Sequence, residues 1–514
     1  MNSTPAPTSP LAIPAPIRCA VTAGAGWRIS QKMTIERHDR WWLLLLVVAL
    51  VPLHALLIWA ANIELNFDEA HYWEWSQHLD WSYYSKGPLI ALAIALPSEL
   101  FGQGDWQVRL MAWLSHGLLL VLLFHFARDL WQSRAAGWWA VLLGLSSPLF
   151  FMLGSVMTTD SLLFPFWTWA LWAAVRALQR GQSHAWYEMG IAVGIGALAK
   201  FSIALLPTLI ALLMLTRAEW RQQFLKPHPW LGALLALAIV SPVLIWNSQH
   251  DWVMFRHEQG HMAGGGIGNF FEVLLGQPLA LSPLLGLVMI ATLVRRPQQP
   301  EAWLVRSLTL MLMVFFLWKS FGGKVQLNWP APIHIGVIVL FAGYAGEWFE
   351  RHRRFMVAGL LAGMLVSILV PFPQLFGLPL HKSYLKKTQA WRESIATLAA
   401  QAGPVDFLIA SHYHLASELA FYWPQRLPVY PLPSGGGRFT QYHLWPGLER
   451  EQGRSALYVT DYAGLAPALL QAFAECKSVG SVPAVTAGGG VVRTLHGWRC
   501  RDYRHIDWPQ PSRY

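Results

Sequence analysis

Residues 41–61, WWLLLLVVALVPLHALLIWAA, form a nearly continuous apolar run. A helix needs about 20 mostly apolar residues to cross the roughly 30 Å of hydrocarbon in a bilayer, and this run is long enough. Similar runs recur along the 514 residues, of which 54% are hydrophobic and only 13% are charged, with a mean hydropathy of +0.35. Many of the 29 Trp and 14 Tyr flank these runs, as in the aromatic belts of membrane proteins. The chain is therefore predicted to cross a membrane many times.

About 11–13 transmembrane helices are expected, and residues 88–102 form either a further span or a helix lying in the interface. The eleven main spans are placed at 41–62, 108–127, 136–154, 161–178, 188–199, 202–216, 230–246, 273–294, 302–318, 329–346 and 355–371. Residues 1–39 are rich in Pro, Ala, Ser and Thr near their start and are expected to be a disordered cytoplasmic tail. The transmembrane domain then covers 40–371, and 372–514 form a separate domain.

Along the chain, connections that bear Arg and Lys alternate with connections that have few of them. The Arg- and Lys-bearing connections all fall on one side: Arg37 and Arg40, Arg128 and Arg134, Arg176 and Arg180, Arg217 to Lys226, Arg295 and Arg296, and Arg351 to Arg354. The positive-inside rule makes that side cytoplasmic, which puts residues 372–514 outside the cytoplasm. Topology and anionic lipid account for much of the net charge of +10, and no nucleic-acid motif accompanies it.

The first external loop carries two adjacent acids in the sequence NFDEAHYWEW. Asp68, Tyr72 and Trp75 are spaced to share one face of a helix, with Glu69 on a neighbouring face. A carboxylate beside aromatic rings suits sugar chemistry, because the rings stack on the sugar while the carboxylate takes a proton from a hydroxyl. The alternative is that the acids only stabilise a helix N-terminus, which is worth about 0.3–1 kcal/mol. That alternative does not explain Asp160, a second acid at the external end of the fourth expected span.

Few basic residues lie on the external side. Either they gather around an anionic ligand near the membrane surface, or each extends to the lipid headgroups. They are Lys86, Arg109, Lys200, Arg256, Lys319 and Lys324. The ligand interpretation gains because carboxylates and glycines share the same loops.

Residues 257–261, HEQGH, match the HExxH pattern of zinc proteases. The histidines are spaced to bind a metal, but the match is short and the sequence AGGGIG follows it, which favours a flexible external loop. A protease is therefore not expected, no cofactor is predicted, and a divalent metal has no support.

The pattern of residues 372–514 predicts a small α/β domain. Strands are expected in PVDFLIAS, LPVYPL, SALYVTD and GGVVRTLHGWRC, and helices in TQAWRESIATLAAQA and HLASELAFYW. Cys476 and Cys500 form a disulfide outside the cytoplasm or stay a free thiol pair, while Cys19 stands alone. The glycines of GGGR (435–438) are too few for a nucleotide-binding loop.

The ordered motifs resemble the GT-C glycosyltransferases related to protein O-mannosyltransferases and to the aminoarabinose transferase of lipid A. The resemblance covers most of the chain from about residue 40. It is carried by DEAHYWEWSQHLDWSYYSKGPLIAL, VMTTDSLL, ALAKFSIALL, PVLIWNSQHDWVMFRHEQG, KVQLNWPAP, SHYHLASELAFYW and GGGRFTQYHLW.

The resemblance implies roles for individual residues. Asp68 and Asp160 match the external-loop acids of the family, with Glu69 as the companion of Asp68, and Lys86 matches the lysine that contacts the lipid-linked phosphate. Two positions depart from the aminoarabinose transferase pattern. His71 replaces an arginine, and Ser85 replaces a zinc-binding glutamate, which argues against both a zinc site and an aminoarabinose substrate.

The resemblance implies a multi-pass enzyme of the cell inner membrane with an extracytoplasmic C-terminal domain. It would transfer a sugar from a polyprenyl-phosphate carrier to an envelope lipid, glycan or protein, inverting the anomeric carbon with Asp68 as general base. Charge stabilisation of the departing phosphate falls to the basic residues. The substrate-binding residues expected are Tyr72, Lys86, Lys200, Arg256 and Lys324. The alternatives are a transporter or flippase for lipid-linked sugars and a non-catalytic sugar-binding or assembly protein.

Overall fold

The computed structural model describes residues 23–260, 266–297, 299–378, 382–433, 438–486 and 488–511. The chain divides into two compact units, residues 1–49 and 50–514. Helix α1 (Ala23–Ala60) begins inside the segment expected to be a tail, because no proline or glycine interrupts residues 27–51 to end the helix before the apolar run. Residues 1–22, which include Cys19, lie outside the described residues, so their assignment as a tail stays a prediction.

Among the described residues, five helices are long and apolar enough to cross a membrane, and three bent pairs raise the number to eight if each pair is one span. The five are Arg37–Ala60 within α1, α4 (Asp105–Trp131), α7 (Thr159–Gln179), α11 (Pro227–Gln249) and α15 (Pro300–Gly322). The bent pairs are α5 (Arg134–Leu145) with α6 (Pro148–Ser155), α13 (Ile267–Leu281) with α14 (Gly286–Ala291) and η3 (Thr292–Val294), and α16 (Pro332–Ala342) with α17 (Ala345–Arg351).

Shorter helices complete the bundle. They are α3 (Leu89–Phe101), α8 (Ala185–Ala199), η1 (Phe201–Ala204), α9 (Leu205–Leu215), α10 (Ala218–Arg221), η2 (Gln222–Leu225) and α18 (Arg353–Leu369). Each of the eleven positions at which a span is expected is occupied by one of these helices or pairs. The chain thus has the helices of a multi-pass membrane protein, as the sequence predicts.

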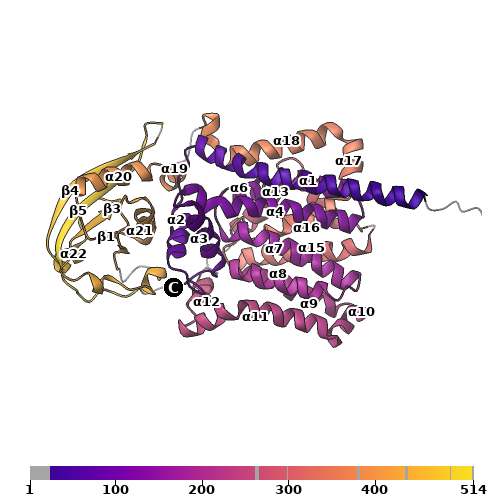
Figure 1. Ribbon diagram of the computed structural model, residues 1–514, viewed down its shortest axis with the longest axis horizontal. Coiled ribbons are helices and arrows are strands. Elements are labelled where there is room, and N and C mark those ends of the chain that lie inside the picture. The colour runs from indigo at the N-terminus through magenta and orange to yellow at the C-terminus, as the bar shows by residue number, and fades with distance from the viewer. Residues whose placement is uncertain are drawn as a thin grey trace, which may run out of the picture. The chain divides into compact units, whose positions relative to one another are not determined.

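The basic connections of the second unit lie together, at the end away from the C-terminal sheet (Figure 1). Arg180, at the end of α7, pairs with Asp129 of α4 at 2.7 Å and with Glu301 of α15 at 3.8 Å. Arg217, before α10, stacks over the ring of Trp303, with its guanidinium carbon 3.7 Å from the ring centroid. This is the clustering that the positive-inside rule requires, while the side of the membrane that this end faces stays a prediction.

The C-terminal domain contains a five-stranded sheet in the order β2-β1-β3-β5-β4. The first three strands in this order are parallel, and β5 pairs antiparallel with both β3 and β4. The strands are β1 (Phe407–Ala410), β2 (Val429–Pro431), β3 (Ala456–Thr460), β4 (Phe473–Val485) and β5 (Val491–Tyr503). The helices are α19 (Lys382–Thr388), α20 (Trp391–Ala402), α21 (Tyr413–Tyr422) and α22 (Pro467–Ala472), with 3-10 turns η4 (Pro373–Phe376), η5 (Gln441–His443) and η6 (Leu448–Glu451).

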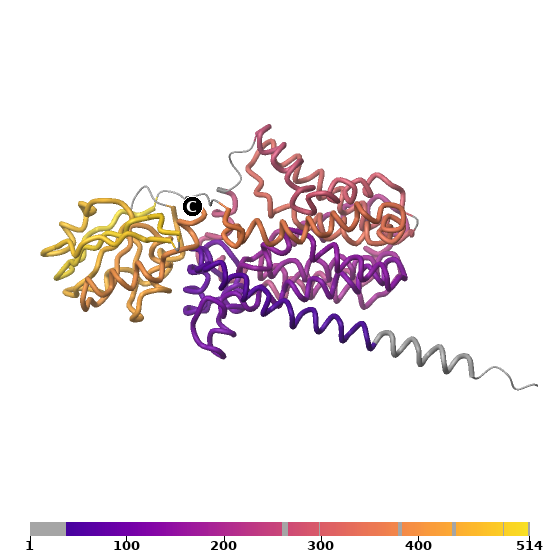
Figure 2. The backbone as a smooth tube through the Cα atoms, turned by 90° about the horizontal axis from the view of Figure 1, so that it is seen from above, coloured from indigo at the N-terminus to yellow at the C-terminus, as the bar shows by residue number. Residues whose placement is uncertain are grey.

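All the strands and both helices that the sequence predicts in this domain are confirmed, whereas β4 was not predicted. Strand β4 lies at the edge of the sheet and most of its side chains are exposed, so it lacks the apolar pattern of a core strand. Two further short helices, α2 (Phe67–Gln77) and α12 (Val253–Gly260), lie between the sheet and the long helices, next to α3 (Figures 1 and 2).

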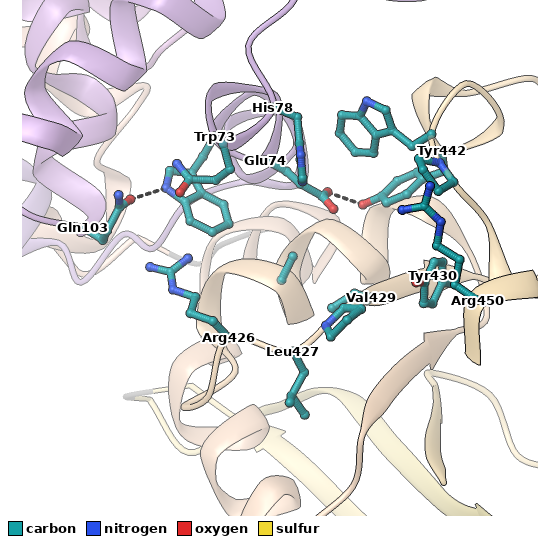
Figure 3. Close-up of a pocket in the computed structure, with 15 residues that line it drawn as sticks. Trp73, Glu74, His78, Gln103, Arg426, Leu427, Val429, Tyr430, Tyr442 and Arg450 are labelled. Carbon is teal, nitrogen blue, oxygen red and sulfur yellow. Dashed lines mark hydrogen bonds between the residues drawn. The ribbon is translucent and has the colours of Figure 1, made fainter. Parts of the chain in front are cut away.

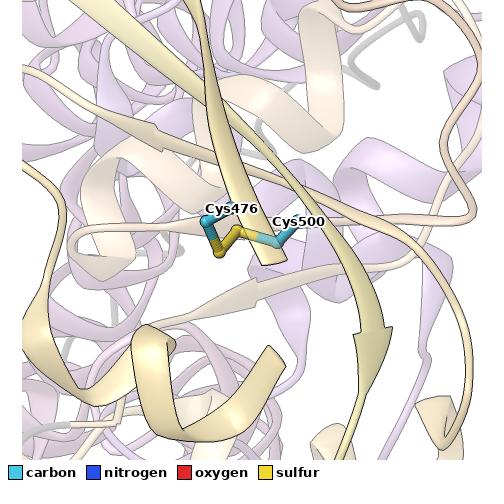
Figure 4. Close-up of a disulfide and its surroundings, with 2 residues drawn as sticks. All are labelled: Cys476 and Cys500. Carbon is cyan, nitrogen blue, oxygen red and sulfur yellow. A yellow bond between two sulfur atoms is a disulfide. The ribbon is translucent and has the colours of Figure 1, made fainter. Parts of the chain in front are cut away.

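Strands β4 and β5 are joined covalently. Cys476 lies directly opposite Cys500 in the antiparallel ladder, and a disulfide links them (Figure 4). Of the two alternatives open from the sequence, the structure contains the disulfide. A disulfide is typical of a domain that folds outside the cytoplasm.

We therefore expect the purified, denatured protein to show one free thiol per chain before reduction and three after it, because the chain has three cysteines and the disulfide occupies two. Titration with a thiol reagent, with and without reductant, measures this. Three reactive thiols without reductant, in protein purified under non-reducing conditions, would contradict the disulfide.

Candidate active site

Helix α2 places the two adjacent acids of the first loop in its first turn. Asn66 caps the helix, because its side-chain oxygen accepts hydrogen bonds from the backbone N–H groups of Asp68 (2.9 Å) and Glu69 (3.2 Å). Glu69 completes a capping box by accepting from the backbone N–H of Asn66 at 3.2 Å. The expected helix is thus present, and its first turn is held rigidly.

Glu69 forms a buried ion pair with Arg109 of α4. The guanidinium Nε and Nη2 lie 2.7 and 2.6 Å from the two carboxylate oxygens, and both side chains are at most 1% exposed. The carboxylate also accepts from the backbone N–H of Met157 at 2.9 Å, just before α7. Arg109 in turn donates to the carbonyl oxygens of Ile63 and Glu64. These contacts favour a positioning role for Glu69 over the catalytic role expected from the sequence.

Asp68, in contrast, is exposed to solvent. Enough protein surrounds its carboxylate for desolvation to raise its pKa. Nearby groups act in the opposite direction and hold the rise in check: His71 whenever its ring is protonated, and the permanent positive charges of Lys387, Lys86 and Arg438. An accessible carboxylate with a raised pKa, surrounded by cations, is suited to accept a proton.

Tyr72 lies between the two acids singled out in the sequence. Its hydroxyl has a pKa well above the usual value, first because of burial and then because of the negative charges of Asp68 and Asp160. Tyr72 is half-buried and packs edge-on against Trp75, with the ring centroids 5.1 Å apart. Trp75 is fully buried and stacks on Tyr83, so it belongs to the core rather than to a sugar-binding surface.

Asp160, in the first turn of α7, holds Lys200 in place. The ammonium group of Lys200 lies 2.8 and 3.0 Å from the two carboxylate oxygens of Asp160, and the side-chain amide of Asn328 donates to the same carboxylate at 2.7 Å. Lys200 stands at the break between α8 and η1, where the backbone is extended. This cluster brings together three segments that lie far apart in the sequence. Asn328, in the motif KVQLNWPAP, was not predicted as a site residue.

Lys86, Lys200 and Lys319 line one apolar pocket of about 350 Å³, here called the lysine pocket. Lys86 donates to the carboxylate of Glu258 at 2.9 Å. Burial alone would raise the pKa of Glu258, but the charge and hydrogen bond of Lys86 lower it overall. The apolar lining includes Phe201, Leu205, Phe255, Phe315, Phe316 and Trp329. Cations beside apolar walls suit an amphiphile with an anionic head.

Three of the five expected substrate-binding residues, Tyr72, Arg256 and Lys324, do not line the lysine pocket. Arg256 is exposed on α12, and Lys324 is exposed in the loop after α15. Lys319, near the end of α15, lines the pocket instead. The sequence places all three of these basic residues in external loops, but only the fold determines which side chain points into the cavity.

The C-terminal domain contributes a recess of about 350 Å³ beside Asp68, here called the sheet-edge recess. It lies where β1 and β2 end, the edge at which parallel sheets usually bind ligands. Arg438 donates from Nη2 to the hydroxyls of Tyr84 (2.9 Å) and Tyr413 (3.3 Å). His414 stacks near Phe67 of α2, with centroids 3.9 Å apart, and burial lowers its pKa to about 3, which keeps it neutral.

Arg438 ends the GGGR segment, whose glycines fall within residues 434–437 and lie outside the described residues. Its position beside Asp68 was not predicted. The only sequence signal for it was its place in the motif GGGRFTQYHLW.

The HExxH match does not form a protease-like centre in the part of the chain that the structure describes. Helix α12 ends at Gly260, and His261 lies outside the described residues. His257 is buried and packs against Tyr84, with ring centroids 5.0 Å apart. Glu258, the general base in a metalloprotease, is paired with Lys86. Among the described residues, no group of three or more His, Cys, Asp or Glu side chains is arranged to hold a metal ion.

The chain is similar to known membrane glycosyltransferases. Residues 85–246 match the family of dolichyl-phosphate-mannose-protein mannosyltransferases. The lipid A galacturonosyltransferase RgtD of Rhizobium johnstonii is 28% identical over 391 residues, which cover 70% of this chain and 79% of that protein. The undecaprenyl phosphate-alpha-4-amino-4-deoxy-L-arabinose arabinosyl transferase of Serratia proteamaculans is 24% identical over 471 residues, or 82% of this chain and 81% of the relative.

The fold is also similar to that of solved structures. The crystal structure of ArnT from Cupriavidus metallidurans in the apo state superposes with a TM-score of 0.59 and 19% identity, covering 88% of this chain and 97% of that one. The same protein bound to undecaprenyl phosphate also gives a TM-score of 0.59, with 17% identity over the same shares.

We expect Arg109→Met to lower the thermal unfolding midpoint strongly or to prevent recovery of folded protein. The substitution leaves Glu69 as an unpaired buried charge, which costs about 3–5 kcal/mol. Tryptophan fluorescence during heating in detergent measures the midpoint. The matched control is Arg504→Met, which breaks an exposed pair with Asp502 worth about 0–1 kcal/mol. An unchanged midpoint for Arg109→Met would contradict the anchoring role of the pair.

Proposed function

The chain belongs to the GT-C superfamily of membrane glycosyltransferases, and we propose that it transfers a sugar from a polyprenyl-phosphate carrier to an acidic glycolipid of the cell envelope. The observation that carries the proposal is the lysine pocket, whose cations lie beside apolar walls and include Lys86, a charge that acts on Asp68. The inner membrane is the corresponding location, with the C-terminal domain outside the cytoplasm.

The donor would lie in the lysine pocket. The polyprenyl chain contacts the apolar side chains of α9, α12 and α15, and the phosphate lies against the ammonium groups of Lys86, Lys200 and Lys319. Asp160 supports this arrangement by fixing Lys200, and Glu258 does the same for Lys86. The similarity in fold to a protein solved with undecaprenyl phosphate supports a carrier of that class.

In the proposed reaction, Asp68 is the base and the lysines stabilise the leaving phosphate. Asp68 takes the proton of the acceptor hydroxyl while that oxygen bonds to the anomeric carbon of the sugar. The bond between this carbon and the carrier phosphate breaks, and its electron pair stays on the phosphate oxygen. Attack from the side opposite the phosphate inverts the anomeric carbon. The leaving phosphate needs no proton, because the lysines stabilise its charge.

The acceptor would approach from the C-terminal domain, since Arg438 and Tyr413 of the sheet-edge recess interact electrostatically with Asp68. Arg438 and Tyr413 then face the group that carries the attacking hydroxyl. The relatives named for lipid A transfer support a glycolipid acceptor. A flippase would instead need ionisable groups along a path through the membrane, whereas Asp68, Lys86 and Asp160 are all at one end of the helices.

We expect Asp68→Asn to lower the transfer rate by about a hundredfold or more, because the amide cannot accept the proton, a loss typical of a missing general base. Release of undecaprenyl phosphate is measured with purified protein, envelope lipid as acceptor, and a panel of undecaprenyl-phosphate-linked sugars. Asp507→Asn, at an exposed position of the C-terminal tail, is the matched control. Wild-type turnover by Asp68→Asn, with a normal unfolding midpoint, would contradict the role of Asp68 as base.

The pH dependence of kcat/KM should reflect the raised pKa of Asp68. The base acts only when deprotonated, so kcat/KM falls as pH drops through its pKa, which lies above the usual aspartate value of about 3.9. Lys387→Met removes a positive charge that lowers this pKa, so the acid limb of the profile should move to higher pH. Lys477→Met, which removes an exposed lysine on the edge strand, should leave the limb in place. An acid limb of the kcat/KM profile at the same pH in wild type and Lys387→Met would contradict the assignment of Asp68 as the base.

A further inference from the structure

A separate cleft of about 700 Å³ is lined by residues of α2 and of the C-terminal domain (Figure 3). Helix α2 supplies Trp73 and Gln77, which leave the helix about 140° and about 180° around its axis from Asp68 at the usual 100° per residue. The C-terminal domain supplies the opposite wall, from residues 426–430 and 442–450. The cleft therefore does not belong to the reaction centre.

Four aromatic side chains line this cleft: Trp73, Tyr430, Tyr442 and Trp445. Hydrogen bonds hold several of them in place. The indole N–H of Trp73 donates to the side-chain oxygen of Gln103 at 2.6 Å, and the hydroxyl of Tyr442 donates to Glu74 (Figure 3). The ring of Trp445 packs on His78, with centroids 4.8 Å apart. Rigid aromatic faces next to amide and carboxylate groups suit a pyranose ring, whose C–H face is apolar and whose edge is polar.

The cleft is lined by two arginines and one carboxylate, Glu74, so the charged side chains in its lining sum to a net positive charge. Arg426 and Arg450 are both exposed, and neither forms an ion pair with another of the described residues. Arg426 lies over the ring of Trp73, with its guanidinium carbon 4.6 Å from the centroid. The acids nearby already have partners, since Glu74 bonds to Tyr442, and Glu451 bonds to Tyr430 and pairs with Arg454. A guanidinium offers paired N–H donors that match a phosphate or a carboxylate.

We propose that this cleft binds an acidic saccharide, meaning a sugar unit that carries a phosphate or a carboxylate. Trp73 and Trp445 contact the sugar ring, while Arg426 and Arg450 bind its anionic group. Tyr430 and Tyr442 also line the sheet-edge recess, so a saccharide of several units can extend from the cleft towards Arg438. That the saccharide is a remote part of the acceptor rests on the proposed function; the affinity for acidic sugars does not.

The direct test is binding to the purified full-length protein in detergent, without donor. N-acetylglucosamine 6-phosphate, N-acetylglucosamine and inorganic phosphate are titrated separately and followed by saturation-transfer NMR. The phosphorylated sugar should bind at least about tenfold more tightly than either of the other two. The double variant Arg426→Gln/Arg450→Gln should lose that advantage, and Trp445→Ala should weaken binding of both sugars. Arg501→Gln, an exposed arginine on β5, is the matched control.

Unchanged affinity in the arginine double variant would overturn the proposal, as would inorganic phosphate binding as tightly as the phosphorylated sugar, which means an anion site without sugar recognition. The unfolding midpoint of each variant is measured alongside, and the single variant Arg450→Gln, at an exposed position, tests the charge if the double variant is unstable.

The same titration with Asp68→Asn separates this proposal from the proposed function, because that variant should lose transfer and keep binding. In transfer assays, the arginine double variant should raise the KM for acceptor lipid about tenfold with kcat nearly unchanged. A lowered kcat with an unchanged KM would overturn the acceptor assignment.

Discussion

The buried ion pair between Glu69 and Arg109 is the contact on which the site depends. It joins α2 to α4 and to the segment before α7, and Arg109 also holds the carbonyl groups of residues 63 and 64. The neighbouring Glu64 carboxylate accepts from the backbone N–H groups of Trp391 and Arg392, at the start of α20. The C-terminal domain and the membrane domain are therefore fastened to the same short stretch of chain, and Asp68 lies within one residue of the anchor.

This arrangement divides the work between adjacent acids. Glu69 is buried, and Arg109 and the backbone N–H of Met157 engage its carboxylate oxygens, so its contacts fix the geometry of α2. Asp68 lacks such partners and is exposed to solvent. Desolvation by the surrounding protein raises its pKa, and nearby positive charges limit that rise. Asp160 and Glu258 in turn orient the lysines that line the pocket. Three of the four acids thus have positioning contacts, which leaves Asp68 for the proposed proton transfer.

Much of the fold could be predicted from the sequence, because span positions depend on local apolar runs and the strands of the C-terminal domain on short apolar segments. The site could be predicted only in part. Asp68, Asp160, Lys86 and Lys200 lie in the motifs, and the structure brings them to one end of the bundle. The partner of Glu69 is 40 positions away and has no local signal. Arg256 and Lys324 share loops with the site, but side-chain direction is set by helix packing, which also buries Trp75 in the core.

The central claim is that Asp68 and the lysine pocket act on opposite sides of the anomeric carbon in a single displacement. The most direct measurement is the anomeric configuration of donor and product, read from the one-bond carbon–proton coupling of the anomeric centre by NMR. Opposite configurations in donor and product are predicted, because the hydroxyl activated by Asp68 enters opposite the departing phosphate. The same configuration in both would contradict this account.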